Sequence, residues 1–258
     1  MNISHISVSR KQLFDECPQK YKYQYHLKLE HEEPEPFYFI YGTLIHKIAE
    51  EYVKGRGKLT LESITSSVLN GDIPVEDDKA GNPVYAPKLE LEYKKRMPEH
   101  LRAIKKLSDQ IGLDGHTEYK FKYDLDPPNG KFVVGVIDRL IQRGNHFFII
   151  DYKTTKKGMW RKDSRSILTD LQLRCYSRVV QKEFKVPAEN IKAALYYVEG
   201  GNLIGAKFSH QALVDAENEL LSAHKQIEAM PPEAAWGNVG RTCRFCAFRR
   251  RCPFYSIT

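Results

Sequence analysis

The sequence predicts an α/β fold in which helices cover a central β-sheet. Within residues 131–155, two runs of β-branched and aromatic residues flank Gly144-Asn145, a two-residue turn of the sort that closes a β-hairpin. Both runs are apolar on both faces, which is typical of central strands covered on each side. Apolar residues at helical spacings occur both before and after this hairpin.

The hairpin also predicts a pair of facing carboxylates. With the turn at this position, the register places Asp138 opposite Asp151, with Cβ atoms about 4.5–5.5 Å apart. Lys153 points to the same face as Asp151 because side chains alternate along a strand. Two ionised carboxylates about 5 Å apart repel by roughly 3 kcal/mol at an effective dielectric of about 20, so something must neutralise them. Either Lys153 forms a structural ion pair with both aspartates, or the pair binds Mg²⁺ or Mn²⁺ and Lys153 orients a metal-bound water.

The composition favours a polyanionic partner. The 258 residues carry a net charge of +7 and have a sequence pI near 9.0, which indicates nucleic acid first and a membrane surface second. No apolar run approaches the roughly 18 residues of a membrane span, and the N-terminal MNISHISVSRKQ lacks the apolar core of a signal peptide. We therefore expect a soluble protein of the cytoplasm with no membrane partner.

Residues 7–29 predict a helix that Pro18 interrupts, with Ser9 as its N-cap. Tyrosines and lysines interleave between residues 20 and 28. Such side chains can hold a nucleic-acid strand by phosphate contacts and base stacking. The same pattern is also that of an amphipathic helix whose lysine heads extend to solvent.

The segment 37–53 predicts a helix whose apolar stripe consists of Ile45, Ile48, Ala49 and Tyr52. His46 and Glu50 lie four residues apart on an adjacent face. A histidine beside a core stripe is commonly structural. It becomes a metal-ligand candidate if the hairpin packs next to this helix.

Residues 54–116 predict a helical insertion over the core, with helices over 61–69 and 89–107. The segment 117–125, TEYKFKYDL, alternates like a strand. After the hairpin, another helix places Gln172 and Tyr176 on one face at i, i+4. Its predicted buried stripe consists of Leu168, Leu171, Cys175 and Val179. A second hairpin turns at 200–202, and a helix follows over 211–230.

Four of the five cysteines suggest a metal site: Cys17, Cys243, Cys246 and Cys252. Intracellular thiols stay reduced, and clustered ones usually bind metal. Zinc commonly uses two C-x2-C pairs, and this chain has only one. A lone N-terminal cysteine with the triplet C-x2-C-x5-C fits a 4Fe-4S cluster better. Such a site would tie together residues 226 positions apart.

Taken in order, these motifs resemble the PD-(D/E)XK nuclease superfamily, in its RecB-like exonuclease branch. They are SVSRKQLFDECPQKY, GTLIHKIAE, GVIDRL, IIDYKT, QLRCY and the cysteine triplet. The pattern is most similar to the small iron-sulfur nucleases associated with CRISPR systems and to their phage-borne relatives. The fourth of these motifs has Asp in a position where many members have Glu, and the resemblance does not cover residues 54–116.

The resemblance implies a restriction-endonuclease-like core with a central mixed sheet flanked by helices. It implies one nuclease domain over residues 1–258. Within that domain, 54–116 would be a helical insertion, while 1–30 and 237–258 would form an iron-sulfur module that joins the two termini.

The resemblance also implies roles for individual residues. The metal ligands would be His46, Asp138, Asp151 and the carbonyl oxygen of Tyr152. Lys153 would be the catalytic lysine, and Gln172 and Tyr176 would flank the site and position DNA or the metal-bound water. Glu50 and Glu118 stand where some relatives have an additional acidic residue. The cluster ligands would be Cys17, Cys243, Cys246 and Cys252.

The implied function is a Mg²⁺- or Mn²⁺-dependent deoxyribonuclease, an exonuclease on single-stranded DNA or DNA ends with a structural 4Fe-4S cluster. A helicase, an integrase or a recombination complex is the implied partner. One alternative is a catalytically silent DNA-binding subunit of a recombination or CRISPR-adaptation complex. Another is a zinc-stapled protein in which Asp138, Lys153 and Asp151 form a structural triad.

Overall fold

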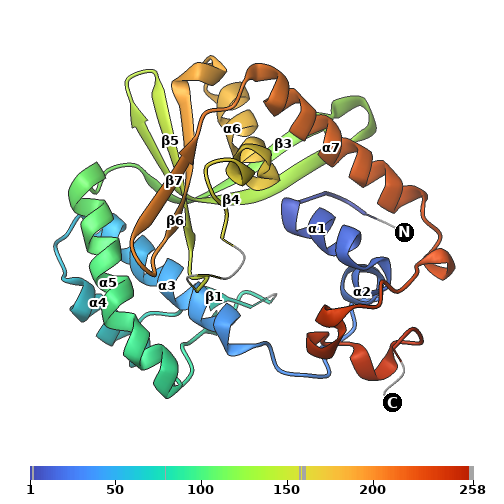
Figure 1. The fold of residues 1–258 in the computed structure, drawn as a ribbon, viewed down its shortest axis with the longest axis horizontal. Helices are drawn as coiled ribbons and strands as arrows, with labels where there is room; N and C mark the ends of the chain where they lie inside the picture. Colours follow the sequence, from blue (N-terminus) through green and yellow to red (C-terminus); the bar gives the residue numbers. More distant parts are fainter. Residues whose placement is uncertain (2, 79, 157, 159–160, 256–258) are drawn as a thin grey trace. The chain divides into compact units, whose positions relative to one another are not determined.

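A computed structural model describes residues 1, 3–78, 80–156, 158 and 161–255 of the chain (Figure 1). The chain forms two compact units. The first unit comprises Met1–Glu35, Lys120–Gly135 and His210–Thr258. The second unit comprises Pro36–Tyr119 and Val136–Ser209.

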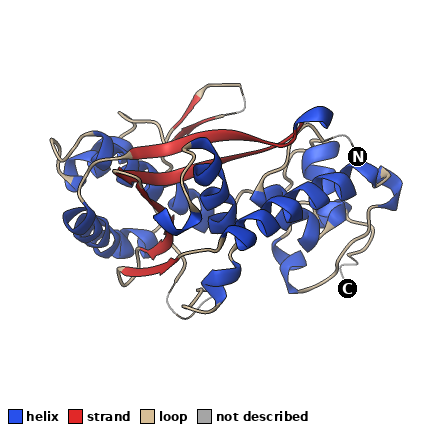
Figure 2. Ribbon diagram, turned by 90° about the horizontal axis from the view of Figure 1, so that it is seen from above, coloured by secondary structure: helices blue, strands red, loops and turns tan. Residues whose placement is uncertain are grey.

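A five-stranded mixed sheet has the strand order β3-β4-β5-β6-β7. Its strands are β3 (His116–Asp126), β4 (Lys131–Arg143), β5 (His146–Lys153), β6 (Ile191–Tyr197) and β7 (Asn202–Ala206). β4 is antiparallel to β5, β5 is parallel to β6, and β6 is antiparallel to β7. The parallel pair needs a crossover connection, which α6 (Leu171–Glu183) provides. Figure 2 shows β3 and β4 as long neighbouring strands. The prediction of an α/β fold with a mixed sheet is confirmed.

The hairpin between β4 and β5 has the predicted register. Arg143 pairs with His146, and the ladder continues to Arg139 opposite Ile150. Gly144 has φ +59°, the left-handed conformation that a tight two-residue turn requires. The next residues along the two strands, where the ladder ends, are Asp138 and Asp151.

Three helices cover one face of the sheet within the second unit. They are α3 (Phe37–Lys54), α4 (Leu61–Leu69) and α5 (Leu91–Ile111). Their buried residues form one core with Ile150 and Tyr152 of β5 and with Tyr196 of β6. Figure 1 shows the three helices on the same side of these strands. The predicted stripe on α3 is buried. Because side chains alternate along β5, Asp151 and Lys153 point to the opposite face, which α6 contacts.

The first unit brings together residues from both ends of the chain. It contains α1 (Val8–Glu16), α2 (Pro18–Tyr21), a π-helical turn η1 (Lys22–His26) and α7 (His210–Ala229). The backbone N–H of Gln19 donates to the carbonyl of Trp236 at 3.0 Å, and the N–H of Glu32 donates to the carbonyl of Ala247 at 3.0 Å. The N-terminal and C-terminal segments are therefore hydrogen-bonded to each other directly.

Two details of the helix predictions are wrong. Ser7, not Ser9, is the N-cap of α1, and its side chain accepts from the N–H of Arg10 at 3.2 Å. Leu168 is 52% exposed because it lies in the short turn η3 (Ser166–Thr169), before α6 begins. The other three members of the predicted stripe on α6 are buried.

The predicted insertion over 54–116 contains α4, α5 and a small hairpin of β1 (Glu76–Asp77) and β2 (Pro83–Val84). The remaining short helical turns are η2 (Pro127–Asn129), η4 (Ala188–Asn190), η5 (Pro232–Ala234), η6 (Arg241–Phe245) and η7 (Arg249–Arg251). The single nuclease domain remains a prediction. Within the described ranges, no helix has the length and apolarity needed to cross a membrane.

Candidate functional site

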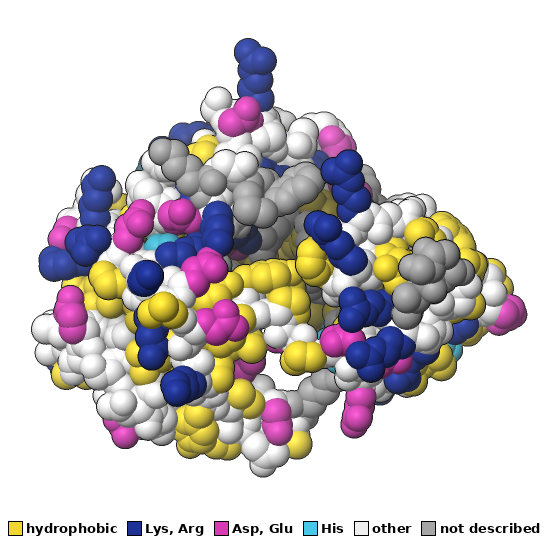
Figure 3. Space-filling view, turned by 60° about the horizontal axis from the view of Figure 1, so that its bottom comes forward, with side chains coloured by type: hydrophobic (Ala, Val, Ile, Leu, Met, Phe, Trp, Pro, Cys, Tyr) yellow, Lys and Arg dark blue, Asp and Glu magenta, His cyan; other side chains and the backbone are white. Residues whose placement is uncertain are grey.

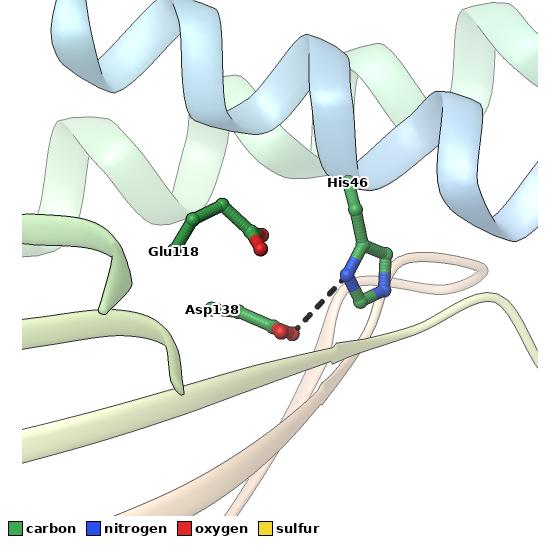
Figure 4. A group of neighbouring side chains, drawn as sticks. All are labelled: His46, Glu118 and Asp138. Carbon is green, nitrogen blue, oxygen red and sulfur yellow. Dashed lines mark ion pairs between the residues drawn. The ribbon is translucent and has the colours of Figure 1, made fainter. Parts of the chain in front are cut away.

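Three side chains from three elements of the second unit converge on one point (Figure 4). His46 of α3, Glu118 of β3 and Asp138 of β4 each offer one ligand atom, and these atoms all lie within 4.8 Å of one another. The Nδ1 atom of His46 is 3.4 Å from Oδ2 of Asp138. An imidazole and two carboxylates suit Mn²⁺ or Mg²⁺. The arrangement is therefore a candidate divalent-metal site.

The orientation of His46 leaves one ring nitrogen for this site. Its Nε2 atom lies 2.9 Å from the carbonyl oxygen of Tyr152. A carbonyl can only accept, so Nε2 carries the proton and donates. In the neutral imidazole, the lone pair is then on Nδ1, which faces Asp138. A hydrogen bond to the far nitrogen is the usual way in which a protein orients a metal-binding histidine.

Glu118 reaches the site from an unusual backbone conformation. Its φ is +47°, in the left-handed region that residues other than glycine rarely adopt. Such strain costs on the order of 1–3 kcal/mol and is concentrated at functional sites. Burial and the charge of Asp138 raise the pKa of Glu118 to about 6. The backbone strain and the raised pKa both indicate a carboxylate that is held in place for a cation.

The electrostatics of the site also favour a cation. Burial and repulsion from Asp138 raise the pKa of Asp151 to about 6. Burial alone would lower the pKa of His46, but Asp138 and Asp151 raise it to about 9. Burial would raise the pKa of Asp138, but His46 and the N–H of Tyr152 lower it. The carboxylates thus hold a proton on the imidazole in the absence of a metal, and a divalent cation would replace that proton.

A chain of polar contacts follows from Asp151 along the face that α6 contacts. Lys153 Nζ lies 2.6 Å from Oδ2 of Asp151 and donates to Oε1 of Gln172 at 3.1 Å. Nε2 of Gln172 donates to the hydroxyl of Tyr176 at 2.8 Å. Asp151 is only 1% exposed, whereas the side chain of Lys153 is partly exposed, so only the carboxylate end of the ion pair is shielded from water. The predicted residues Asp151, Lys153, Gln172 and Tyr176 are therefore in contact with one another.

The backbone of Tyr152 connects His46 with Asp138. Its N–H donates to Oδ2 of Asp138 at 2.7 Å, and its carbonyl accepts from His46. In this structure the carbonyl, a predicted metal ligand, thus orients the histidine. Glu50 lies outside the group of three and forms ion pairs with Lys47 at 3.0 Å and with Lys54.

This geometry agrees with a match to a protein family. The family model described as the PD-(D/E)XK nuclease superfamily matches residues 5–253, which is almost the whole chain. The chain belongs to the PD-(D/E)XK nuclease superfamily. Its substrate is therefore a nucleic acid and its reaction class is hydrolysis.

Solved structures resemble this superfamily member in fold. A crystal structure from Eubacterium rectale named "Putative exonuclease" has a TM-score of 0.56 and 14% sequence identity, and the match covers 94% of this chain and 88% of that chain. The protein SSO0001 has a TM-score of 0.44 and 14% identity, with 99% of this chain and 89% of that chain covered. No curated protein matches the sequence.

The superfamily name describes an aspartate followed by Asp or Glu, any residue and lysine. In this chain, Asp138 and the run Asp151-Tyr152-Lys153 have that order. Glu118 was predicted only as one of two possible additional acids. The regular alternation of residues 117–125 gave no signal that it would join His46 and Asp138.

The first unit contains a second candidate site. A cavity there is lined by Cys17, Cys243, Cys246 and Cys252. The N–H of Gly240 donates to Sγ of Cys243 at 3.3 Å. Burial raises the pKa of Cys246, and the nearby Cys17 and Cys252 raise it further. The structure thus places the four predicted cysteines around one cavity, while the fifth, Cys175, is buried in α6.

Proposed function

We propose that this protein is a Mn²⁺- or Mg²⁺-dependent exonuclease that hydrolyses phosphodiester bonds of DNA, acting on single strands or DNA ends. The observation that carries the proposal is the group of His46, Glu118 and Asp138 near the ion pair of Asp151 and Lys153. The name of the Eubacterium rectale protein supports exonuclease activity in particular. The net charge of +7 suits a polyanionic substrate.

His46, Glu118 and Asp138 would hold the cation through Nδ1 and two carboxylate oxygens. Asp151 and the carbonyl of Tyr152 remain proposed further ligands. Asp151 has a second carboxylate oxygen beside the one that contacts Lys153, and the Tyr152 carbonyl has a second lone pair. Because one donor is an imidazole nitrogen, which is softer than a carboxylate, Mn²⁺ should support activity at least as well as Mg²⁺.

When bound, the cation polarises the scissile phosphate and lowers the pKa of a bound water. Lys153 would align the attacking water and offset the negative charge that develops at the phosphate. Burial would lower the pKa of Lys153, but Asp151 raises it and so keeps the ammonium charged. Gln172 fixes the position of Nζ, and Tyr176 fixes the amide of Gln172. These two residues position Lys153.

A structural 4Fe-4S cluster bound by Cys17, Cys243, Cys246 and Cys252 forms part of the proposal. A tetrahedral zinc site with Zn–S bonds of about 2.3 Å needs sulfurs roughly 3.8 Å apart. In the described part of the chain, no three cysteine sulfurs lie within 4.8 Å of one another. A cubane binds each cysteine to a different iron and so needs wider spacing. The cluster would reinforce the contact between the chain ends, since hydrolysis has no redox step.

Metal-dependent digestion of labelled DNA tests the proposed function. Single- and double-stranded substrates labelled at the 5′ or 3′ end are incubated with Mn²⁺, with and without EDTA. We expect release of terminal nucleotides with Mn²⁺ and none with EDTA. Tight DNA binding without any hydrolysis would instead assign a catalytically silent subunit. Lys153→Ala should lose this activity. Its matched control is Lys106→Ala, which removes an exposed lysine on α5 and should retain it.

A further inference from the structure

The C-terminal segment exposes aromatic side chains beside the cysteine cavity. Phe245 lies between Cys243 and Cys246 and is 65% exposed. Phe248, three residues later, is 1% exposed and packs on Tyr23. The turn therefore has one phenylalanine in the core and one in solvent. We call Trp236, Val239, Arg241, Arg244 and Phe245 the cysteine-turn surface; all five are exposed, and all belong to the first unit.

The charge around this surface is positive. Residues 231–255 contain five arginines and one acidic residue, Glu233. Three of the arginines form ion pairs with two acids from the N-terminal segment. Arg249 and Arg250 pair with Glu33 at 3.1 and 2.9 Å, and Arg251 pairs with Glu32.

The two other arginines lie in the cysteine turn itself. Arg241 and Arg244 are exposed and have no carboxylate within 4.0 Å in the ranges that the structure describes. Their charge remains available to a ligand, whereas each arginine of residues 249–251 has a carboxylate beside it.

Arg244 and Phe245 form a stacked pair. The guanidinium carbon of Arg244 is 4.6 Å from the centre of the Phe245 ring. A guanidinium over one ring face is attracted by the ring and leaves the other face accessible. Hydrophobic and basic side chains also lie side by side in several places on the face shown in Figure 3. Exposed aromatic rings beside arginines bind single-stranded nucleic acid, because bases stack on the ring and phosphates contact the cations.

We propose that the cysteine-turn surface binds single-stranded DNA, with a base stacked on Phe245 and phosphates held by Arg241 and Arg244. The positive charge of this surface favours single-stranded DNA as the ligand, because each nucleotide brings one phosphate to two arginines that have no carboxylate beside them. The inference rests on the proposed function in one respect: single-stranded DNA is the proposed substrate.

Fluorescence anisotropy with a labelled oligothymidine in EDTA tests the inference without any cleavage. We expect Phe245→Ala to weaken binding at least about fivefold. Phe245→Tyr should bind like the wild type, whereas Phe245→Leu should resemble Phe245→Ala, because leucine is apolar but has no flat face. Arg244→Gln should also reduce the slope of log K against log salt by about 0.7, the value for one phosphate contact on a single strand. Arg102→Gln, which removes an exposed arginine on α5, is the matched control and should change neither quantity by a comparable amount.

Wild-type affinity in Phe245→Ala or in Phe245→Leu would overturn the inference. So would a change in sedimentation of Phe245→Ala without a change in DNA affinity, because the surface would then contact a second copy of the chain. Visible absorbance and thermal unfolding confirm that each variant is folded. Hydrolysis of a short oligonucleotide with Mn²⁺ is measured separately. If Phe245→Ala loses DNA binding but the wild type never cleaves, only the nuclease proposal fails. If the wild type cleaves but Phe245→Ala binds DNA as the wild type does, only the proposed DNA-binding surface fails.

Discussion

His46 donates a hydrogen bond from Nε2 to the carbonyl oxygen of Tyr152 at 2.9 Å, and this bond determines which nitrogen faces the carboxylates. Because Nε2 keeps its proton, Nδ1 is the ring atom that would give up its proton to a cation, and it lies 3.4 Å from Asp138. The partner is a backbone atom of a central strand, so the ring is oriented by a rigid element. The candidate metal site is therefore preorganised by the packing of α3 on β5.

Replacing His46 with alanine should weaken Mn²⁺ binding. Loss of a partner that only orients a ligand already costs about 10- to 100-fold in metal affinity, and loss of the ligand itself should cost at least as much. Isothermal titration with Mn²⁺ measures the change. His116→Ala, which removes an exposed histidine at the start of β3, is the control and should bind Mn²⁺ like the wild type. Equal affinities in the two variants would contradict the site.

Replacing Glu118 should stabilise the protein while weakening metal binding. Glu118→Gln removes the repulsion from Asp138 that contributes to the raised pKa. Glu118→Asn removes the same charge and also adopts φ near +47° more readily. We expect Asn to raise the free energy of unfolding by about 1 kcal/mol more than Gln does. Urea unfolding in EDTA measures this difference. A glutamine variant as stable as the asparagine variant would show that the backbone is not strained.

The register of the hairpin could be predicted because a two-residue turn fixes which residues face each other. Asp138, Asp151 and Lys153 followed from that register. The role of Glu118 did not, because the alternation of β3 places it on the same face as Lys120 and Lys122, as a solvent-exposed residue would be. Only the left-handed backbone at residue 118 departs from that pattern, and glutamate does not signal such a conformation.

The start of α1 depended on a contact between distant residues, whereas the start of α6 is determined by a local N-cap. Ile6 pairs with Val133 in a single bridge, which keeps the chain extended before α1 and makes Ser7 the N-cap. Asp170 accepts from the N–H of Leu173 at 2.8 Å, so α6 begins after Leu168. The spacing of Gln172 and Tyr176 did predict their contact, because residues four apart on a helix are neighbours.

Lys153→Ala should abolish cleavage while leaving DNA binding largely intact. The ammonium lies 2.6 Å from Asp151. In the proposed mechanism it would position the attacking water, so we expect kcat to fall by at least about 100-fold. Gln172→Ala should lower kcat less and leave KM nearly unchanged, because Gln172 acts through Lys153. Single-turnover cleavage and DNA anisotropy separate the two effects. Cleavage by Lys153→Ala at the wild-type rate would falsify the assignment of this lysine.

Cys17→Ser should remove the visible absorption of the purified protein, at about 400 nm for an iron-sulfur cluster. It should also lower the free energy of unfolding by roughly 4 kcal/mol, if a cluster that links Cys17 to the C-terminal cysteines stabilises the fold as a disulfide across so long a loop would. Cys175→Ala is the control: this cysteine is buried in α6 and does not line the cavity, so the colour should remain. A colourless wild-type protein that contains zinc would overturn the cluster proposal.

The stability of the protein should fall in mild acid because of His100. This side chain is fully buried and contacts the hydroxyl of Tyr41 at 2.9 Å, and Nε2 has no hydrogen-bond partner in the described residues. Burial lowers the pKa of His100 to about 4, below the value of about 6.5 in the unfolded chain. Between these values the unfolded state binds more protons, so stability is retained above pH 6.5 and declines as the pH falls towards 4.

The expected loss from His100 is up to about 3 kcal/mol at pH 4. His100→Asn keeps a polar atom near Tyr41 and cannot take up a proton, so its unfolding free energy should depend less steeply on pH over this range. Urea unfolding of the wild type and the variant at intervals between pH 7 and pH 4 measures the difference. His116→Asn, at an exposed position, should follow the wild type. Parallel curves for wild type and His100→Asn would show that this histidine does not take up a proton on unfolding.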